Sequence, residues 1–211
     1  MKPIGQTLFQ ELRQTPGFQN CIIAGGFIRD SICNKEYTDV DVFVPIDDIV
    51  EQEEKTEQGI KFPSSLSNPE YSPNTYSKLS LTYEDKWDLK YHDILDVDIM
   101  TMPVKGGPDF GETVVNSFDY GINMCWYDGE IHTTKEFDRD REFGYITLQR
   151  LNRVKELPFM MKRFFKLQSK FKDFVFQSKV KFETEENRNN LFSRLTRKEV
   201  KRSAYTLDNN F

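Results

Sequence analysis

The chain has 211 residues, 37% of them hydrophobic and 14% aromatic, which is enough for one well-packed domain, alone or with a small helical appendage. It has no apolar run of membrane-spanning length and its first segment is polar, so we expect neither a transmembrane helix nor a secretion signal. The three cysteines are widely spaced and the two histidines isolated, which disfavours a disulfide framework or a structural zinc site and favours a reducing cytoplasm.

Charge is distributed unevenly along the chain. Residues 1–150 carry 14 Lys and Arg against 27 Asp and Glu, a net charge of −13, whereas residues 151–211 carry 15 against 7, a net charge of +8. We therefore predict a head domain over 1–150 and a basic helical extension over 151–211. The extension is either a solvated helical face or a surface that attracts a polyanion such as RNA.

The first part of the chain has the periodicity of alternating helices and strands. Apolar spacing and turn residues predict a helix over 4–14, a buried strand over 21–24, a Gly25-Gly26 turn, a helix over 26–33, a strand over 38–44 and a helix near 48–57. In the strand over 38–44, the valines at 40, 42 and 44 fall on one side, and Asp39, Asp41 and Phe43 fall on the other.

The rest of the chain predicts more strands, followed by helices. Residues 58–77 are rich in Pro, Ser and Asn and are expected to form a long loop. After this loop we expect a hairpin of 77–85 with 87–94 and a strand over 94–101. A helical stretch is expected over 109–127, interrupted near Gly111 or Gly121, and short strands at 130–134 and 145–150. The last elements are expected to be a helix from 151 onward and a weaker one near 184–204. We therefore predict an α+β fold with a mixed sheet flanked by helices.

Two carboxylates on one face of a strand carry the clearest chemical signal. Asp39 and Asp41 are separated by one residue, so both project from the same face, with oxygens that suit a hard cation such as Mg²⁺. Repelling acids in an otherwise apolar strand need a cation or a functional reason. A third acid is expected from a neighbouring strand; Asp98 is preferred, Asp96 is an alternative, and Asp93 is a weaker one.

The turn before these acids suits a phosphate. Gly25 and Gly26 lie between a predicted strand and a predicted helix, where glycine lets a phosphate approach the backbone and the helix N-terminus offers free N–H groups. The order strand, Gly-Gly, helix and Asp-x-Asp within about 20 residues supplies each need of phosphoryl chemistry.

Residues 25–44, GGFIRDSICNKEYTDVDVFV, resemble the head-domain signature of the poly(A) polymerase and CCA-adding nucleotidyltransferase family, part of the DNA polymerase β-like superfamily. Gly25, Gly26, Arg29, Asp30, Asp39 and Asp41 fill its positions. Asn34 stands where the family usually has Gly, a mild departure because Asn also tolerates a left-handed backbone.

A second segment, FDYGINMCWYDG at 118–129, is similar to the family's later head-domain motif, which contacts the nucleotide's sugar and phosphates. Asp119 and Asn123 match its Asp and Asn, while Ser117 and Phe118 occupy the positions of two arginines. Binding of a triphosphate in the manner of the family therefore requires Arg139, Arg141 or a lysine of the extension to substitute for these arginines. The alternative interpretation of this segment is a core helix with a capping Asp.

The resemblance covers roughly residues 20–150 and implies a nucleotidyltransferase palm. It implies that two Mg²⁺ ions are held by Asp39, Asp41 and Asp98, and that a nucleoside triphosphate is bound near Gly25, Gly26, Arg29, Asp119 and Asn123. The acceptor would be RNA or a protein hydroxyl. The long base-selecting body of CCA-adding enzymes has no match here, and such stand-alone heads resemble small bacteriophage proteins. A regulatory module that keeps the palm but binds nucleotide, RNA or a partner protein is the alternative.

Overall fold

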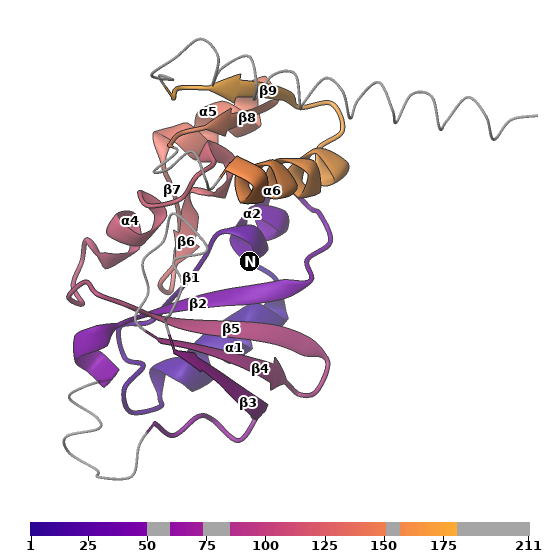
Figure 1. The fold of residues 1–211 in the computed structure, drawn as a ribbon. Helices are drawn as coiled ribbons and strands as arrows, with labels where there is room; N and C mark the ends of the chain where they lie inside the picture. Colours follow the sequence, from indigo (N-terminus) through magenta and orange to yellow (C-terminus); the bar gives the residue numbers. More distant parts are fainter. Residues whose placement is uncertain (50–59, 74–84, 151–156, 181–211) are drawn as a thin grey trace, which may run out of the picture.

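The computed structural model of the chain describes residues 1–49, 60–73, 85–150 and 157–180. Seven of its strands form one sheet in the order β3-β4-β5-β2-β1-β6-β7, and β8 and β9 form a second, two-stranded sheet (Figure 1). The elements are α1 (Pro3–Arg13), β1 (Ile22–Ala24), α2 (Gly26–Ile32), β2 (Asp39–Pro45), β3 (Leu66–Pro73), β4 (Asp85–Tyr91), β5 (Leu95–Met102), α4 (Phe110–Val115), η1 (Gly121–Asn123), β6 (Cys125–Tyr127), β7 (Ile131–Thr133), α5 (Lys135–Phe143), β8 (Tyr145–Leu148), α6 (Leu157–Lys170) and β9 (Val175–Ser178).

The centre of the large sheet is a parallel pair, β2 and β5. The other neighbouring strands of this sheet pair antiparallel, so the sheet is mixed and the predicted α+β class is confirmed. The parallel register places Asp41 beside Asp98 and Asp39 beside Asp96. Because paired residues point to the same face, this register decides which acids can meet.

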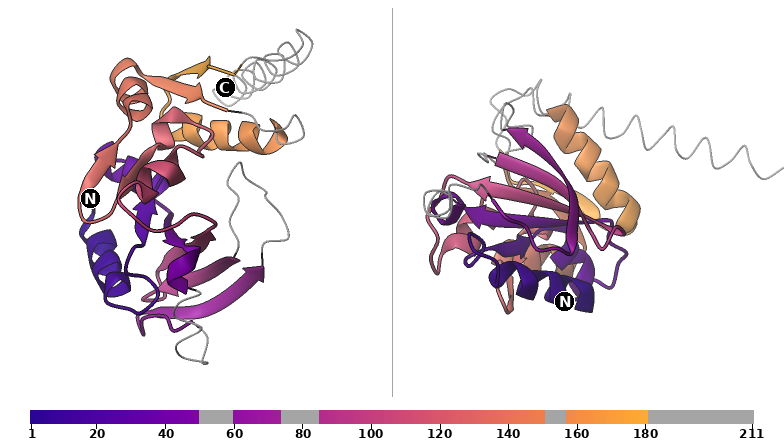
Figure 2. Two further views of the ribbon diagram at one scale, coloured as in Figure 1. Left: turned by 90° about the vertical axis from the view of Figure 1, so that its left-hand side faces the viewer. Right: turned by 90° about the horizontal axis from the view of Figure 1, so that it is seen from below.

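The two faces of the sheet have different neighbours, and α1 and α6 lie on opposite sides of it (Figure 2). Val40, Val42 and Val44 are fully buried in one core cluster together with Leu8 and Leu12 of α1. The opposite face carries a second cluster, which includes Phe43 of β2, Met100 of β5 and apolar residues of α4. The predicted alternation of β2 is therefore confirmed, and its acids share their face with Phe43.

The predicted loop over 58–77 is wrong over part of its length, because Leu66–Pro73 form β3. This strand pairs with β4 at the edge of the sheet, where a proline that lacks an N–H group is tolerated. The register shifts between Ser67 and Glu70, beside Asn68 at φ 53°. The predicted hairpin partner of β4, residues 77–85, lies outside the described residues except for Asp85; within them, β4 pairs with β3 and with β5.

The helical prediction over 109–127 is correct only at its start. Helix α4 ends at Val115, Gly121–Asn123 form a single 3₁₀ turn, and Cys125–Tyr127 form a strand against β1. Tyr120 is extended and bridges to Leu148, which breaks any continuous helix. Two further elements were not predicted: α5, which Thr134 caps and Gly144 ends at φ 69°, and β9, which pairs parallel with β8.

Other predictions are confirmed or fall outside the described residues. Helices over 4–14 and 26–33 and the strands near 21–24, 94–101, 130–134 and 145–150 correspond to described elements. Most of the helix near 48–57, residues 74–84 and 151–156, and the helix near 184–204 lie outside the described ranges. No described helix has the length and apolarity needed to cross a membrane.

Candidate functional site

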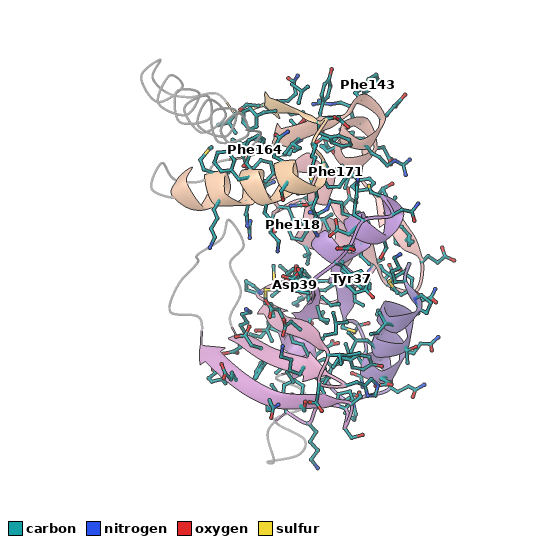
Figure 3. The ribbon with its side chains drawn as sticks, turned by 90° about the vertical axis from the view of Figure 1, so that its right-hand side faces the viewer. Tyr37, Asp39, Phe118, Phe143, Phe164 and Phe171 are labelled. Carbon is teal, nitrogen blue, oxygen red and sulfur yellow. The ribbon has the colours of Figure 1, made fainter. Side chains whose placement is uncertain are left out.

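A cleft opens over the acid-bearing face of the sheet, between β2, β5, α2 and α6. Its volume is about 270 Å³, near the lower end of the range of about 300–1,000 Å³ for small-molecule pockets. Figure 3 shows Asp39 and Phe118 in the space between the sheet and α6. All eight residues predicted for the site line this cleft: Gly25, Gly26, Arg29, Asp39, Asp41, Asp98, Asp119 and Asn123.

Carboxylates of β2 and β5 line the floor of the cleft, and the row of neighbouring acids continues onto β4 beside it. Asp41 on β2 pairs in register with Asp98 on β5, which pairs in turn with Asp88 on β4. Asp39 lies two residues before Asp41 on the same face. Of the three candidates for the third acid, only Asp98 lines the cleft. Asp96 and Asp93 are exposed, and Asp96 forms an ion pair with Lys90 and lines a neighbouring hollow beside β3 and β4 that Asp98 also borders.

Crowding of these acids changes their protonation. Burial, with the charges of Asp39 and Asp98 adding to it, raises the pKa of Asp41 to about 7. Burial also raises the pKa of Asp98 to about 6, although Lys86 opposes the shift. The floor of the cleft therefore holds more negative charge than it can stabilise alone near neutral pH.

Lys86 on β4 compensates part of this charge, and sequence reasoning did not find it. Its Nζ lies 2.8 Å from Oδ2 of Asp98 and 2.6 Å from Oδ1 of Asp88. The side chain is 22% exposed, so the bridge is partly shielded from water. Lys86 lies two residues from Asp88, and this spacing on one strand face was the signal that could have found it.

Carboxylate oxygens on one face of the sheet suit Mg²⁺, but these carboxylates do not converge on a single metal position. Among the described residues, no group of three His, Cys, Asp or Glu side chains is arranged as a metal site. The donor chemistry of Asp39, Asp41 and Asp98 nevertheless fits a hard divalent cation, and the raised pKa of Asp41 indicates charge that such a cation would relieve. These residues thus fit a metal in the chemistry of their donors, although the structure does not gather them around one point, and Lys86 competes for Asp98.

The Gly25-Gly26 turn forms one end of the cleft. Gly25 is the N-cap residue of α2, at φ 77°, a conformation that favours glycine, and a Cβ there would meet the Phe118 ring at 3.2 Å. Phe118 is buried, and its ring centroid lies 5.8 Å from that of Phe43. At position 118 the structure therefore has an apolar filler where the resembled motif has an arginine.

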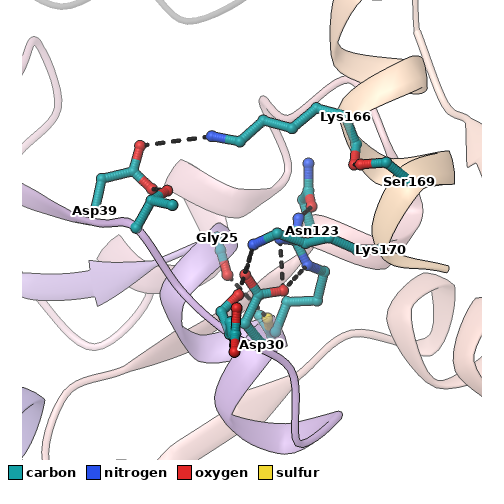
Figure 4. A network of polar contacts seen from close by, with 11 residues as sticks. Gly25, Asp30, Asp39, Asn123, Lys166, Ser169 and Lys170 are labelled. Atoms are coloured by element: carbon teal, nitrogen blue, oxygen red, sulfur yellow. Dashed lines mark hydrogen bonds and ion pairs between the residues drawn. The ribbon is translucent and has the colours of Figure 1, made fainter.

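Arg29 lines the cleft and belongs to a buried polar network, whose members Asp30, Asn123 and Lys170 are labelled in Figure 4. It is 5% exposed; its Nε donates to Oδ1 of Asp30 at 2.7 Å, and its Nη1 donates to Oδ1 of Asn123 at 2.5 Å. Lys170 of α6 donates to the other oxygen of Asp30. Arg29 and Asn123 therefore brace one another and join α2 to η1, while both still face the cleft.

Asp119 is 2% exposed, and its Oδ2 accepts a hydrogen bond from Nη1 of Arg163 at 2.7 Å. Its backbone oxygen accepts from the Gln149 N–H group. The residue is thus held by an arginine of α6, and Asn123 reaches the same cleft through the 3₁₀ turn that follows. The predicted spacing on one helical face is wrong, yet the two side chains meet in the cleft.

Helix α6 supplies cations that the sequence did not assign individually. Arg163, Lys166 and Lys170 line the cleft, and Lys166 Nζ lies 3.7 Å from Oδ2 of Asp39. Their spacing of three and four residues on a predicted helix was the available signal. The other two candidate substitutes for the missing arginines lie elsewhere: Arg139 donates to Thr147, and Arg141 lines a hollow beside Cys33.

The fold is similar to that of CCA-adding enzymes of known structure, among 36 matching chains. A CCA-adding enzyme with ATP gives a TM-score of 0.56 at 18% identity, over 94% of this chain and 43% of that one. The apo form I of a CCA-adding enzyme gives a TM-score of 0.55 at 20% identity, over 93% of this chain and 45% of that one. The Thermotoga maritima CCA-adding enzyme complexed with tRNA gives a TM-score of 0.54 at 17% identity, over 92% of this chain and 43% of that one.

These identities establish the nucleotidyltransferase fold and nothing finer. The chain spans less than half the length of the enzymes it matches. No curated protein matches its sequence. A family model described as "Gabija anti-defense 2 family protein" matches residues 5–143, about two thirds of the chain. The chain is therefore a member of the Gabija anti-defense 2 family.

Proposed function

We propose that this protein is a metal-dependent nucleotidyltransferase, which transfers a nucleoside monophosphate from a nucleoside triphosphate to a hydroxyl acceptor. The observation that carries the proposal is the carboxylate row: Asp39 and Asp41 on β2 lie beside Asp98 on the parallel strand β5, at the floor of a cleft. Gly25 and Gly26 stand at its end and cations of α6 line its wall. A dense anionic floor facing cations suits a triphosphate that arrives with divalent metal.

Each residue of the cleft then has a role. Asp39, Asp41 and Asp98 would hold two Mg²⁺ ions, which supply electrostatic stabilisation of the attacking and leaving oxygens. Gly25 and Gly26 leave room for the triphosphate, and Arg29 keeps α2 and Asn123 in place through its bonds to Asp30 and Asn123. Asp119 and Asn123 would contact the nucleotide.

The reaction is a displacement at the α-phosphorus of the triphosphate. The acceptor oxygen forms a bond to this phosphorus as the bond to the bridging oxygen of the β-phosphate breaks, and pyrophosphate leaves with the electron pair. Asp98 orients the acceptor hydroxyl and receives its proton. The acceptor is RNA attracted by the basic residues 151–211, or a protein hydroxyl. The three free cysteines are compatible with the reducing conditions of the cytoplasm.

The test is label transfer. The purified chain is incubated with each α-labelled triphosphate and Mg²⁺, against pooled RNA and against cell protein, beside the Asp39→Ala/Asp41→Ala variant. We expect label in one acceptor class with the wild type and none with the variant. Absence of transfer, together with absence of metal-dependent nucleotide binding, would rule out the enzyme.

A second function is favoured by two observations. Lys86 already pairs with Asp98, and Phe118 fills an arginine position, which is the pattern of a palm that binds without reacting. Such a module would bind nucleotide, RNA or a partner protein as a regulator. Thermal shift distinguishes the two: stabilisation by ATP that needs Mg²⁺ and is lost in Asp39→Ala/Asp41→Ala favours the enzyme, whereas stabilisation by RNA alone, indifferent to the acids, favours the module.

The family description adds a cellular test. We propose that the cleft serves the anti-defense role that the family name denotes. In cells that carry a Gabija defence system, the wild-type chain is expected to suppress defence. Equal suppression by Asp39→Ala/Asp41→Ala at equal expression would separate the cleft from that role.

A further inference from the structure

We propose that Lys166 and Arg163 of α6 form the triphosphate grip of this protein, and that Lys166 exchanges Asp39 for phosphate when metal and nucleotide enter together. This inference rests on the proposed function, because it assigns the substrate contacts of the same cleft. It also accounts for Ser117 and Phe118, which leave the resembled motif without its two arginines.

The orientation of α6 is fixed by its apolar side. Phe164 and Leu167 of α6 are 2% and 3% exposed, Phe171 directly after the helix is 3% exposed, and all three belong to the main core cluster. Arg163, Lys166 and Lys170 follow one another at spacings of three and four residues and line the cleft. Since residues at these spacings share one side of a helix, burial of the apolar side holds the cationic side over the carboxylates.

One end of the helix is anchored by buried contacts. Lys170 forms an ion pair with Asp30 and donates to the backbone oxygen of Glu36 at 2.8 Å. The Phe171 ring lies under the Arg29 guanidinium, 5.6 Å from its centroid. Lys170 is thus committed to the protein, and we assign it to positioning the helix rather than to the nucleotide.

Lys166 is held much more loosely. Its side chain is 59% exposed, that of Asp39 is 44% exposed, and the 3.7 Å between them is longer than a good charged hydrogen bond. Exposed ion pairs of this kind contribute little to stability, so the contact is readily exchanged. Figure 4 shows Lys166 reaching from α6 across the cleft to Asp39, the path that a phosphate chain would occupy.

Arg163 is held more firmly than Lys166, yet some of its N–H donors remain available to the cleft. Its Nη1 is bound to Oδ2 of Asp119, its side chain is 32% exposed, and it lines the cleft. A guanidinium has five N–H donors in a planar fork, so one carboxylate leaves others for phosphate. Arg163 is therefore pre-oriented by Asp119, and Lys166 is the residue whose partner changes.

This arrangement predicts opposite effects of one substitution. While Lys166 neutralises Asp39, it weakens the attraction of the floor for a cation, and it becomes a phosphate ligand only when that cation arrives with a nucleotide. Lys166→Met is therefore expected to tighten binding of Mn²⁺ alone and to weaken binding of Mg²⁺ with ATP. A purely structural role for Lys166 would move both in the same direction.

The experiment is calorimetric titration of the full chain with Mn²⁺ alone and, in the presence of Mg²⁺, with ATP, inorganic tripolyphosphate and AMP. The variants are Lys166→Met, Lys166→Arg and Arg163→Lys. The control is Lys162→Met, an exposed residue of α6 that does not line the cleft. We expect Lys166→Met to weaken ATP and tripolyphosphate by roughly 10- to 100-fold and to leave AMP unchanged. Lys162→Met should stay close to wild type, Lys166→Arg should recover much of the affinity that Lys166→Met loses because it keeps the charge, and Arg163→Lys should weaken ATP by about ten-fold.

The grip is overturned if Lys166→Met binds ATP as tightly as the wild type, weakens AMP by the same factor, or weakens Mn²⁺ alone. It is overturned together with the proposed function if the wild type binds neither ATP nor tripolyphosphate. Binding that depends on Lys166 without any label transfer would remove the proposed function and keep the grip. Label transfer by Lys166→Met at the wild-type kcat/KM would keep the function and remove the grip.

Discussion

Asp41 shows how a single residue can be unfavourable for the fold and still be placed by it. Its neighbours Val40 and Val42 are fully buried, so the strand cannot turn the carboxylate away from the cleft without exposing them. Beside it stand Asp39 and Asp98, whose charges add to the effect of burial. At neutral pH the folded chain therefore carries an electrostatic penalty that a bound cation would offset.

The first prediction concerns Asp41→Asn in the presence of EDTA. Folding raises the pKa of Asp41 to about 7, so the folded protein binds this proton more tightly than the unfolded chain does. The protonated side chain therefore gives its full contribution to stability below about pH 4, and this contribution is lost as the pH rises through 7. Removing the carboxylate should stabilise the metal-free protein by roughly 2 kcal/mol near pH 8 and have little effect near pH 4. Urea denaturation at both pH values measures this, and a variant less stable than wild type at pH 8 would contradict it.

The second prediction concerns Lys86, which bridges Asp88 and Asp98. Lys86→Met leaves both carboxylates without their cation, so the metal-free protein should lose about 1–2 kcal/mol at pH 8, and Mg²⁺ should restore most of it. The matched control on the same strand is Lys90→Met, whose exposed pair with Asp96 should cost below about 1 kcal/mol. Thermal melts with EDTA and with Mg²⁺ report both, and equal losses that Mg²⁺ does not restore would refute this account of Lys86.

At the scale of elements, α2 and α6 are joined by Asp30. This carboxylate is 1% exposed and is shared by Arg29 of its own helix and Lys170 of α6. The segments are 140 residues apart in sequence, yet their pairing sets the height of α6 above the cleft. A buried ion pair of this kind stabilises one arrangement strongly, because breaking it leaves buried charges without partners.

The third prediction follows from this contact. Asp30→Asn leaves Arg29 buried without a carboxylate and should cost about 3–5 kcal/mol in the free energy of unfolding. Asp96→Asn, which removes an exposed acid, should cost below about 1 kcal/mol. Urea denaturation of both variants gives the comparison, and similar small losses would show that Asp30 does not anchor α6.

Elements with a strong local pattern were predictable from the sequence. The apolar spacing of α1, the glycine turn before α2 and the alternation of β2 and β5 each agree with the structure. The edge strand β3 was not predictable from the sequence, because its prolines indicate a loop and only pairing with β4 makes it a strand. Helix α5 is short and mostly polar, and β9 forms through parallel pairing with β8, which no local signal reveals.

At the scale of the whole molecule, the cleft is assembled from segments far apart in the chain. The acids and glycines were predictable because their motif is local, within residues 25–44. Lys86 and the α6 cations were not assigned, since they reach the cleft only through the sheet register and the packing of α6. The roles of all these residues stay predictions, and so does the division of the chain at residue 150, on either side of which β8 and β9 pair.

The charge distribution of the whole chain belongs to the same account. The acidic head places a carboxylate floor next to cations of α6, so charge that is unbalanced along the sequence is paired across the cleft. Raising the ionic strength should weaken ATP binding, because phosphate contacts with Lys166 are exposed and screened by salt. Titrations at low and at about 0.5 M salt measure this, and affinity independent of salt would argue against a cationic grip.

The central claim is that the α-phosphate of a nucleotide ends on an acceptor. The most direct measurement follows ATP labelled at the α-phosphate and, in parallel, at the γ-phosphate, with Mg²⁺, the wild-type chain and the acceptor fraction. The account predicts covalent α-label on the acceptor, γ-label released as pyrophosphate, and neither with Asp39→Asn/Asp41→Asn. Covalent γ-label, or release of phosphate with no α-label on any acceptor, would contradict it.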